Sequence, residues 1–364
     1  MTQPAGAAAG LAGSPRPASS GASSDLTATP LCPPPYRAPG WLPGAHAQTI
    51  YPLLIAPGPV PQGRRERWDT PDGDFIDLDW FDPAGDAAPG AKAPPLPPLV
   101  VLFHGLEGSS DSPYARALMR AVLAKGWGGV VPHFRGCSGE ANRLPRAYHS
   151  GDSDEIDWIL ARIAQRFPDR RRLAVGVSLG GNALLKWAGE RGEAAAGRVE
   201  AIVAVSAPLD LVACGHHLAR GFNRIYTHNF LKTLKAAAAA KLVRFPGHFA
   251  GRLDLGRLAA ARTLYEFDDL FTAPVHGFAG VEDYWRRASA KPWLPLIRLP
   301  ALLINAHNDP FMPAGVLPGA AEVAAATKRD FPRAGGHVGF VSGSLPGNLD
   351  WLPQRILYFF CHEV

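Results

Sequence analysis

Apolar and polar positions divide the middle of the chain into two kinds of segment that alternate. Short, largely apolar runs without polar alternation are typical of strands that are buried on both faces. These runs are Leu99–Phe103, Trp127–Val131, Leu173–Val177, Ala201–Val205 and Ala301–Ile304. Between them lie segments of helical periodicity, clearest from Ser153 to Phe167, where apolar residues recur on one face. The alternation predicts an α/β protein whose parallel sheet carries helices on both faces.

Further strand signals flank this middle part of the chain. Residues 64–70 and 74–81 surround Pro71-Asp72-Gly73, which has the composition of a tight turn, so they predict a hairpin. Residues 328–332 predict the last strand, and residues 352–361 predict a closing helix. With the five central runs, these segments predict a mostly parallel sheet of about eight strands.

The strand pattern stops between about residues 209 and 292. Residues 230–245 and 253–267 have helical character within this stretch. Ligands of such sheets bind at the carboxyl ends of the strands. We therefore expect a helical lid, inserted so that it covers that edge of the sheet.

The N-terminal part of the chain has a different composition. Residues 1–35 are rich in Ala, Gly, Ser and Pro, which predicts a disordered tail. Residues 36–364 are then expected to form one domain. The first part of that domain, around residues 41–55, is expected to be an irregular arm that packs on the rest.

Charge and cysteine content exclude several classes of function. The 364 residues include 37 Lys and Arg and 32 Asp and Glu, a formal net charge of +5 without a long basic run, so nucleic acid is not an expected partner. No apolar stretch reaches the roughly 18 residues of a membrane helix, and we expect no stable membrane insertion. The four cysteines form no CxxC pair, which predicts reduced thiols in the cytoplasm, no metal site and no cofactor.

Ser178 lies in the sequence Gly176-Val-Ser-Leu-Gly180, between an apolar run and a helical pattern. A serine at a sharp turn from strand to helix has strained backbone, and small neighbours let the two elements approach. The hydroxyl then stays accessible, and the unpaired N–H groups of the helix favour negative charge beside it. An ordinary glycine-rich turn has the same pattern, so the surrounding motifs decide between the two interpretations.

Asp309 and His337 follow Ser178 in the chain, each shortly after a predicted strand. A serine hydroxyl becomes nucleophilic when a histidine takes its proton and a carboxylate orients that histidine. Serine, acid and histidine in this order occur on α/β-hydrolase sheets. We therefore expect these three residues to be catalytic. The alternatives are a turn aspartate, a loop histidine, and Asp210 as a rival acid.

Two backbone N–H groups are candidates for binding the negative oxygen of a tetrahedral intermediate, which needs preorganised donors. One is the N–H of Leu179, directly after the serine, and the other is the N–H of Leu106 in the turn His104-Gly105-Leu106. We expect His104 to shape this turn rather than to transfer protons. Glu107 is either a ligand for a cation of the lid or substrate, or a solvated loop carboxylate.

Together these motifs resemble the α/β-hydrolase superfamily, and in particular its YheT-like subgroup, which includes lipid hydrolases of animals and plants. The resemblance extends from about Tyr36 to the C-terminus. The blocks that carry it are residues 46–49, 104–108, 133–140, 148–151, 176–182, 267–274, 308–311 and 335–340. The resemblance implies an α/β-hydrolase fold and ester hydrolysis with Ser178, Asp309 and His337 as the catalytic triad.

The leading hypothesis is a serine esterase that cleaves short- to medium-chain acyl esters through an acyl-enzyme on Ser178. A second hypothesis is a lipase, phospholipase or acyltransferase that acts on lipid esters. A third is a binding module on a hydrolase scaffold without catalytic activity. The expected partner is a small-molecule or lipid ester, and the sequence leaves the oligomeric state open.

Overall fold

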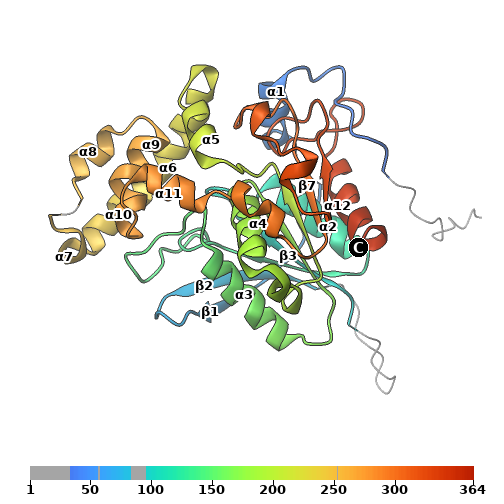
Figure 1. Ribbon diagram of the computed structural model, residues 1–364, viewed down its shortest axis with the longest axis horizontal. Coiled ribbons are helices and arrows are strands. Elements are labelled where there is room, and N and C mark those ends of the chain that lie inside the picture. The colour runs from blue at the N-terminus through green and yellow to red at the C-terminus, as the bar shows by residue number, and fades with distance from the viewer. Residues whose placement is uncertain (1–32, 56–57, 83–95, 252) are drawn as a thin grey trace, which may run out of the picture. The chain divides into compact units, whose positions relative to one another are not determined.

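Eight strands form one mixed sheet in the computed structural model, which describes residues 33–55, 58–82, 96–251 and 253–364 (Figure 1). Their order across the sheet is β1-β2-β4-β3-β5-β6-β7-β8, and from β4 to β8 all neighbours are parallel. The strands are β1 (Arg64–Asp69), β2 (Phe75–Phe81), β3 (Leu99–Phe103), β4 (Gly128–Pro132), β5 (Arg172–Val177), β6 (Ala201–Val205), β7 (Ala301–Ile304) and β8 (Thr327–Asp330). The predicted mostly parallel sheet is confirmed.

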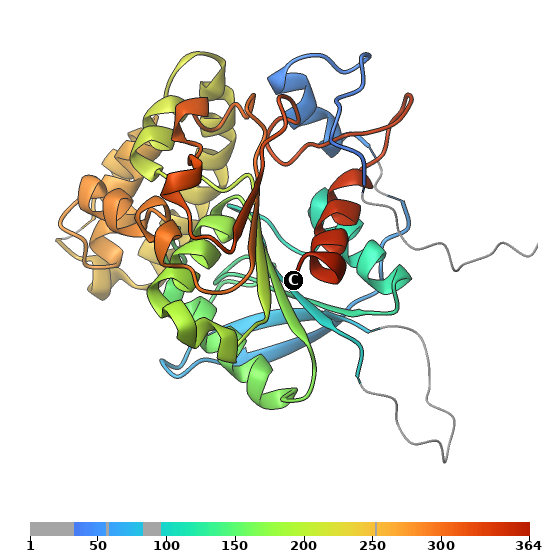
Figure 2. The same ribbon diagram turned by 45° about the vertical axis from the view of Figure 1, so that its right-hand side comes forward.

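Helices cover both faces of this sheet, as predicted (Figure 2). On one face, α2 (Pro113–Ala124) and α12 (Trp351–His362) pack together on the strands. On the other face lie α3 (Ser153–Arg166) and α4 (Leu179–Arg191). The strands between these two layers are buried along their whole length, which is why β3 and β6 are continuous apolar runs. The carboxyl ends of the parallel strands meet at one edge, where ligands of such sheets bind.

The hairpin of β1 and β2 is antiparallel and extends the sheet at one side. Its inner strand β2 is buried although it contains Asp77 and Asp79. Each aspartate accepts two hydrogen bonds from one arginine of β1, at 2.7 and 2.8 Å from Arg67 and at 2.7 and 2.9 Å from Arg65. Buried carboxylates need such partners, so cross-strand ion pairs let this strand enter the sheet.

Residues 211–288 form the helices at the left of Figure 1. The predicted helix 230–245 is part of a longer one, and the predicted helix 253–267 is divided because Asp254 and Thr263 each cap a new start. The helices are α5 (Leu211–Leu218), α6 (Arg224–Arg244), α7 (Pro246–Phe249), α8 (Leu255–Ala260), α9 (Leu264–Phe267), a π-helical turn (Asp268–Thr272), α10 (Ala273–Val275) and α11 (Val281–Ala288). Their action as a lid stays a prediction.

One local expectation was wrong. The arm predicted to be irregular contains α1 (Ala45–Ile50) and a 3₁₀ turn at Tyr51–Leu53, both too short to produce a recognisable period. Helix α4 starts at Leu179, directly after the serine, so it includes Gly180 and Gly181. Most of the predicted tail, residues 1–32, lies outside the described residues.

Asn182 joins three segments behind the sheet edge. Its side-chain amide donates to the carbonyl oxygens of Ser150 and Ala288 at 2.8 and 2.7 Å. Its Oδ1 accepts the N–H of Ala290 at 2.9 Å. Asn182 is fully buried, and its contacts to Ala288 and Ala290 lie in the interior, where water cannot replace a lost partner.

We expect Asn182→Ala to lower the free energy of unfolding by about 3 kcal/mol, because it leaves buried backbone groups without partners. Urea denaturation followed by circular dichroism measures this loss. The matched control is Asn229→Ala on the exposed face of α6, where we expect a change within about 0.5 kcal/mol. Equal stability of the two variants would contradict the assigned role of Asn182.

Candidate active site

Ser178 occupies the turn between β5 and α4 in a left-handed backbone conformation, with φ of 52° and ψ of −119°. Such a conformation is costly for a residue other than glycine. The glycines on either side allow the tight packing that imposes it. A Cβ on Gly176 would stand 2.5 Å from the carbonyl oxygen of Gly180, and a Cβ on Gly180 would collide with the carbonyl oxygens of Phe103 and His104. This close packing directs the Ser178 side chain away from the sheet.

The structure brings Ser178, Asp309 and His337 together. The Nε2 atom of His337 lies 3.0 Å from the Ser178 hydroxyl oxygen, and its Nδ1 atom lies 2.9 Å from Oδ2 of Asp309. Asp309 also accepts the N–H of Phe311 at 2.8 Å and is buried. The rival acid Asp210 does not contact this histidine; it caps α5 by accepting the N–H of Ala213 at 3.0 Å.

Helix α1 holds the loop that carries His337, a contact that sequence reasoning missed. The Thr49 hydroxyl accepts the backbone N–H of His337 at 2.9 Å. The side-chain oxygen Oε1 of Gln48 accepts from the Asn308 side-chain amide and from the backbone N–H of Gly335, both at 2.9 Å. Gln48 therefore ties the loop of the acid to the loop of the histidine. The one available signal was the block His46–Thr49, which contributed to the family resemblance without an assigned role.

The imidazole plane of His337 is fixed by stacking. Its ring lies on that of Phe311 with a centroid distance of 3.9 Å and an interplanar angle of 16°. Phe311 in turn contacts the rings of Tyr226 and Phe230 on α6 at 4.9 and 5.7 Å. Helix α6 therefore supports the histidine through Phe311.

The turn after β3 lies directly against the serine. A Cβ on Gly105 would stand 3.2 Å from the Cβ of Ser178, so a side chain there would crowd the serine. His104 is fully buried, accepts the Phe134 N–H at its Nε2 at 3.0 Å, and lies with its Nδ1 2.8 Å from the Gly105 oxygen. Burial lowers the pKa of His104 to about 3, so the ring stays neutral and its Nδ1–H donates to that oxygen. This arrangement agrees with a role in shaping the turn.

A mainly apolar cavity of about 270 Å³ opens beside Ser178 and His337. Burial raises the pKa of both cysteines that line it, that of Cys137 to about 12, so neither thiol ionises readily. Helices α5, α6 and α9 and the π-helical turn supply most of the apolar wall, which includes Leu211, Leu218, Phe230, Leu234, Ala237, Leu264, Phe267 and Phe271. The space suits an apolar group attached to a carbonyl near the serine.

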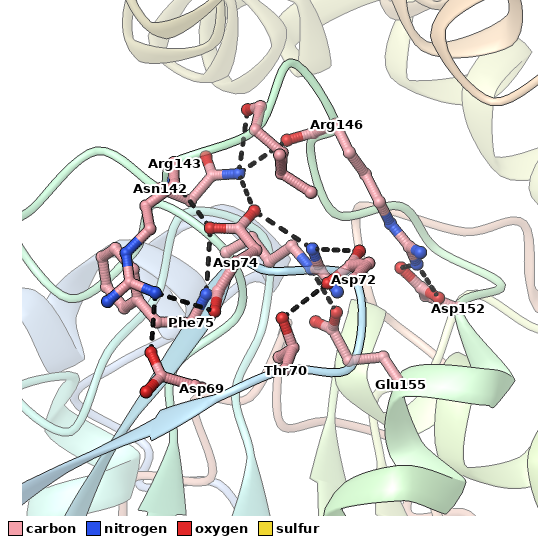
Figure 3. Close-up of polar contacts among 12 residues, drawn as sticks. Asp69, Thr70, Asp72, Asp74, Phe75, Asn142, Arg143, Arg146, Asp152 and Glu155 are labelled. Atoms are coloured by element: carbon pink, nitrogen blue, oxygen red, sulfur yellow. Dashed lines mark hydrogen bonds and ion pairs between the residues drawn. The ribbon is translucent and has the colours of Figure 1, made fainter.

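A buried ionic network anchors the segment of residues 133–152, which forms another wall of the cavity. The Arg135 guanidinium donates to Asp72 at 2.8 Å, Asp74 at 3.0 Å and Glu155 at 2.5 Å. Figure 3 shows these carboxylates beside the second pair of the network, in which Arg146 donates to both oxygens of Asp152 at 2.6 Å. The network ties the segment to the hairpin turn and to α3.

Helix α6 is attached to the same segment by Lys241. Its ammonium group donates to the Asn142 side-chain oxygen at 2.5 Å and to the carbonyl oxygens of Leu144 and Arg146, both at 3.0 Å. Burial lowers the pKa of Lys241 to about 8. The three acceptors are neutral. Among the charged groups nearby, the Asp74 carboxylate favours the protonated ammonium, whereas Arg244 and Arg135 oppose it.

Comparison with known proteins places this arrangement in a family. Residues 98–344 match the alpha/beta hydrolase fold family over more than half of the chain. The chain belongs to this family. It is 42% identical over 311 residues to a protein of Escherichia coli (strain K12) named "Putative esterase YheT", covering 85% of this chain and 88% of that protein.

More distant relatives of this hydrolase agree with that assignment. "Phospholipase ABHD3" of Mus musculus is 28% identical over 326 residues, with 88% of this chain and 76% of that protein covered. The crystal structure of the 2,6-dihydroxy-pseudo-oxynicotine hydrolase superposes with a TM-score of 0.53 at 15% identity, covering 86% of this chain and 72% of that one. This last likeness concerns the fold alone. Within the described residues, no helix has the length and apolar character that crossing a membrane requires.

We expect acid to destabilise the fold through His104. The pKa of His104 is about 3 in the folded chain, and its ordinary value of 6.5 applies to the unfolded chain. Between these values the unfolded chain binds a proton that the folded chain does not. The free energy of unfolding therefore falls as the pH falls below about 6.5. The loss by pH 5 amounts to about 2 kcal/mol. Other buried groups also titrate in this range, so the share of His104 is the difference between the original chain and a variant without this imidazole, each denatured with urea at pH 7 and pH 5.

The variant His104→Gln keeps an amide donor and acceptor but cannot take up this proton. It should be less stable than the original chain at pH 7, yet lose less stability between pH 7 and pH 5. His307→Gln, at an exposed loop position, serves as control and should leave the pH dependence unchanged. An unaltered pH dependence in His104→Gln would show that this residue does not cause the acid sensitivity.

Proposed function

We propose that this hydrolase is a serine carboxylic ester hydrolase that forms an acyl-enzyme on Ser178. The observation that supports it best is the continuous chain of contacts from the Ser178 hydroxyl through His337 to Asp309, at 3.0 and 2.9 Å. Both distances are within the range needed for proton transfer and for orienting the base. The names of the relatives support hydrolysis in general, and the geometry supports the proposal that these three residues carry it out.

In the proposed reaction, Nε2 of His337 takes the Ser178 proton as the oxygen attacks the ester carbonyl carbon. The carbonyl electron pair moves to oxygen, and the resulting negative charge is stabilised by the backbone N–H groups of Leu106 and Leu179. Collapse of this intermediate releases the alcohol, which receives the proton from His337. In the second half of the reaction, His337 takes a proton from water as the water oxygen attacks the acyl carbon. His337 then returns this proton to the Ser178 oxygen as the carboxylic acid leaves.

Asp309 does not exchange protons in this scheme. Its carboxylate accepts the Nδ1–H of His337, which fixes the tautomer with a free Nε2 and stabilises the imidazolium that forms. Stacking on Phe311 restricts the ring to the plane in which Nε2 points at the serine. Burial of Asp309 strengthens this electrostatic support, because little water competes with the imidazolium.

The proposed substrates are esters with a short or medium acyl chain, because the apolar cavity beside the serine has a volume of only about 270 Å³. The lipid-ester alternative is favoured by the same apolar walls and by the name of the phospholipase relative. The two candidates share one mechanism and differ in the length of chain and the form in which the ester is presented.

We expect Ser178→Ala to lower the rate of p-nitrophenyl ester hydrolysis by several powers of ten and to abolish labelling by a fluorophosphonate probe. Asp309→Asn should lose activity by a similar order, since an amide holds the wrong tautomer of His337. The matched control is Asp210→Asn, which alters a helix cap and should retain activity. Full activity of Ser178→Ala would refute the proposal, and an unlabelled but folded original chain would favour a binding module.

A panel of p-nitrophenyl esters from acetate to palmitate tests the substrate class. We expect kcat/KM to be highest for short and medium chains and to fall for chains that exceed the cavity. The control is the same panel with esters presented in detergent micelles and in phospholipid vesicles. A maximum at long chains that requires vesicles would favour the lipid-directed alternative.

A further inference from the structure

Two tyrosine hydroxyls bracket the peptide N–H that the proposed function assigns to the oxyanion. We propose that Tyr114 and Tyr148 are positioning residues that fix the Leu106 N–H for the transition state. This inference rests on the proposed function, because it concerns the donor and not the nucleophile. Neither tyrosine contacts the reacting atoms; each acts on a backbone group next to the donor.

The two hydroxyls hold the residues on either side of Leu106. Tyr114, at the start of α2, accepts the N–H of Gly105 at 2.9 Å. Tyr148, in the segment before α3, accepts the N–H of Glu107 at 2.9 Å. Because its two neighbours are fixed from different elements, the Leu106 peptide has little freedom to rotate. A donor held in place before the reaction stabilises charge without reorganising when that charge forms.

Tyr148 makes a second contact that restrains the backbone directly. Its hydroxyl donates to Oε1 of Glu107 at 2.7 Å while it accepts the N–H of the same residue. Glu107 has a φ of 54°, a left-handed conformation that is unfavourable for a residue with a side chain. The two hydrogen bonds between Tyr148 and Glu107 offset the energetic cost of this conformation. The pKa of Tyr148 is raised well above its usual range, chiefly by burial, so the hydroxyl remains a donor.

Another polar group of the turn, the Gly105 oxygen, is held as well. The Gly105 oxygen accepts from the ring of His104 at 2.8 Å and from the N–H of Gly108 at 2.9 Å. The Tyr148 ring stacks on Phe134 at 5.4 Å and 8°, and the Phe134 N–H is bound by His104. The tyrosine, the histidine and the turn are thus linked by contacts, and His104 can accept the Phe134 N–H only while its ring is neutral.

The variants Tyr148→Phe and Tyr114→Phe remove the hydroxyls and keep the rings. If the inference is correct, each lowers kcat by about tenfold or more with little change in KM, because the donor is needed mainly in the transition state. Tyr36→Phe is the matched control: it removes a buried hydroxyl that donates to the Val341 oxygen at 2.8 Å, away from this turn. We expect it to keep kcat.

A second readout separates positioning from a structural role. A trifluoromethyl ketone is attacked by the Ser178 oxygen, and its carbonyl oxygen becomes an alkoxide that needs the same donors. The corresponding secondary alcohol fills the cavity but cannot be attacked. Both tyrosine variants should weaken inhibition by the ketone in the same proportion as kcat/KM, and should bind the alcohol unchanged.

The outcomes are distinguishable. Folded tyrosine variants with unchanged kcat and unchanged ketone inhibition would overturn the inference while an inactive Ser178→Ala still supports the proposed function. Equal weakening of the ketone and the alcohol would also overturn it, because that result indicates a damaged cavity. Should Tyr148→Phe fail to fold, Glu107→Ala removes the acceptor of the Tyr148 hydroxyl at an exposed position and should lower kcat in the same way.

Discussion

The left-handed backbone of Ser178 is the constraint on which the site depends. Strand β5 and helix α4 can meet at so sharp an angle only because Gly176 and Gly180 carry no side chain, and the contacts of these glycines leave the serine one outward direction. Because the Ser178 hydroxyl is fixed in this way, other segments of the chain have to position the groups that act on it. The acid, the histidine and the turn of Leu106 all follow strands whose carboxyl ends share this edge.

The sheet and the main helices could be predicted because each follows from its local pattern. Buried strands such as β3 and β6 are continuous apolar runs, and α3 has a clear apolar face. The local sequence is therefore enough to predict each of these elements. The residues Ser178, Asp309 and His337 could be proposed from chain order and position after strands, and their roles stay proposals. Helix boundaries in residues 211–288 were less accurate, because caps such as Thr263 interrupt a pattern that composition alone continues.

The support of the site could not be predicted, because it consists of contacts between distant parts of the chain. Thr49 binds His337 across 288 positions, and Gln48 binds Gly335 across 287. Arg135 donates hydrogen bonds to carboxylates of the hairpin turn and of α3. No local sequence pattern indicates that these two segments contact the same arginine. Polar side chains carry no periodicity that reveals a partner. The partner that stabilises a buried charged side chain can be identified only from the structure.

The polar and apolar parts of the site come from different parts of the chain, and this separation has a consequence for function. The groups proposed to react lie at the edge of the sheet and on loops that hydrogen bonds hold in place. These hydrogen bonds include the two between the tyrosine hydroxyls and the residues on either side of Leu106. Most of the apolar wall comes from helices within residues 211–288, attached through Lys241 and through the rings that support His337. Changes in the helical wall can therefore alter which acyl group fits while the reacting atoms keep their geometry. Because Phe311 joins the wall to the imidazole, such changes are best tolerated away from Tyr226 and Phe230.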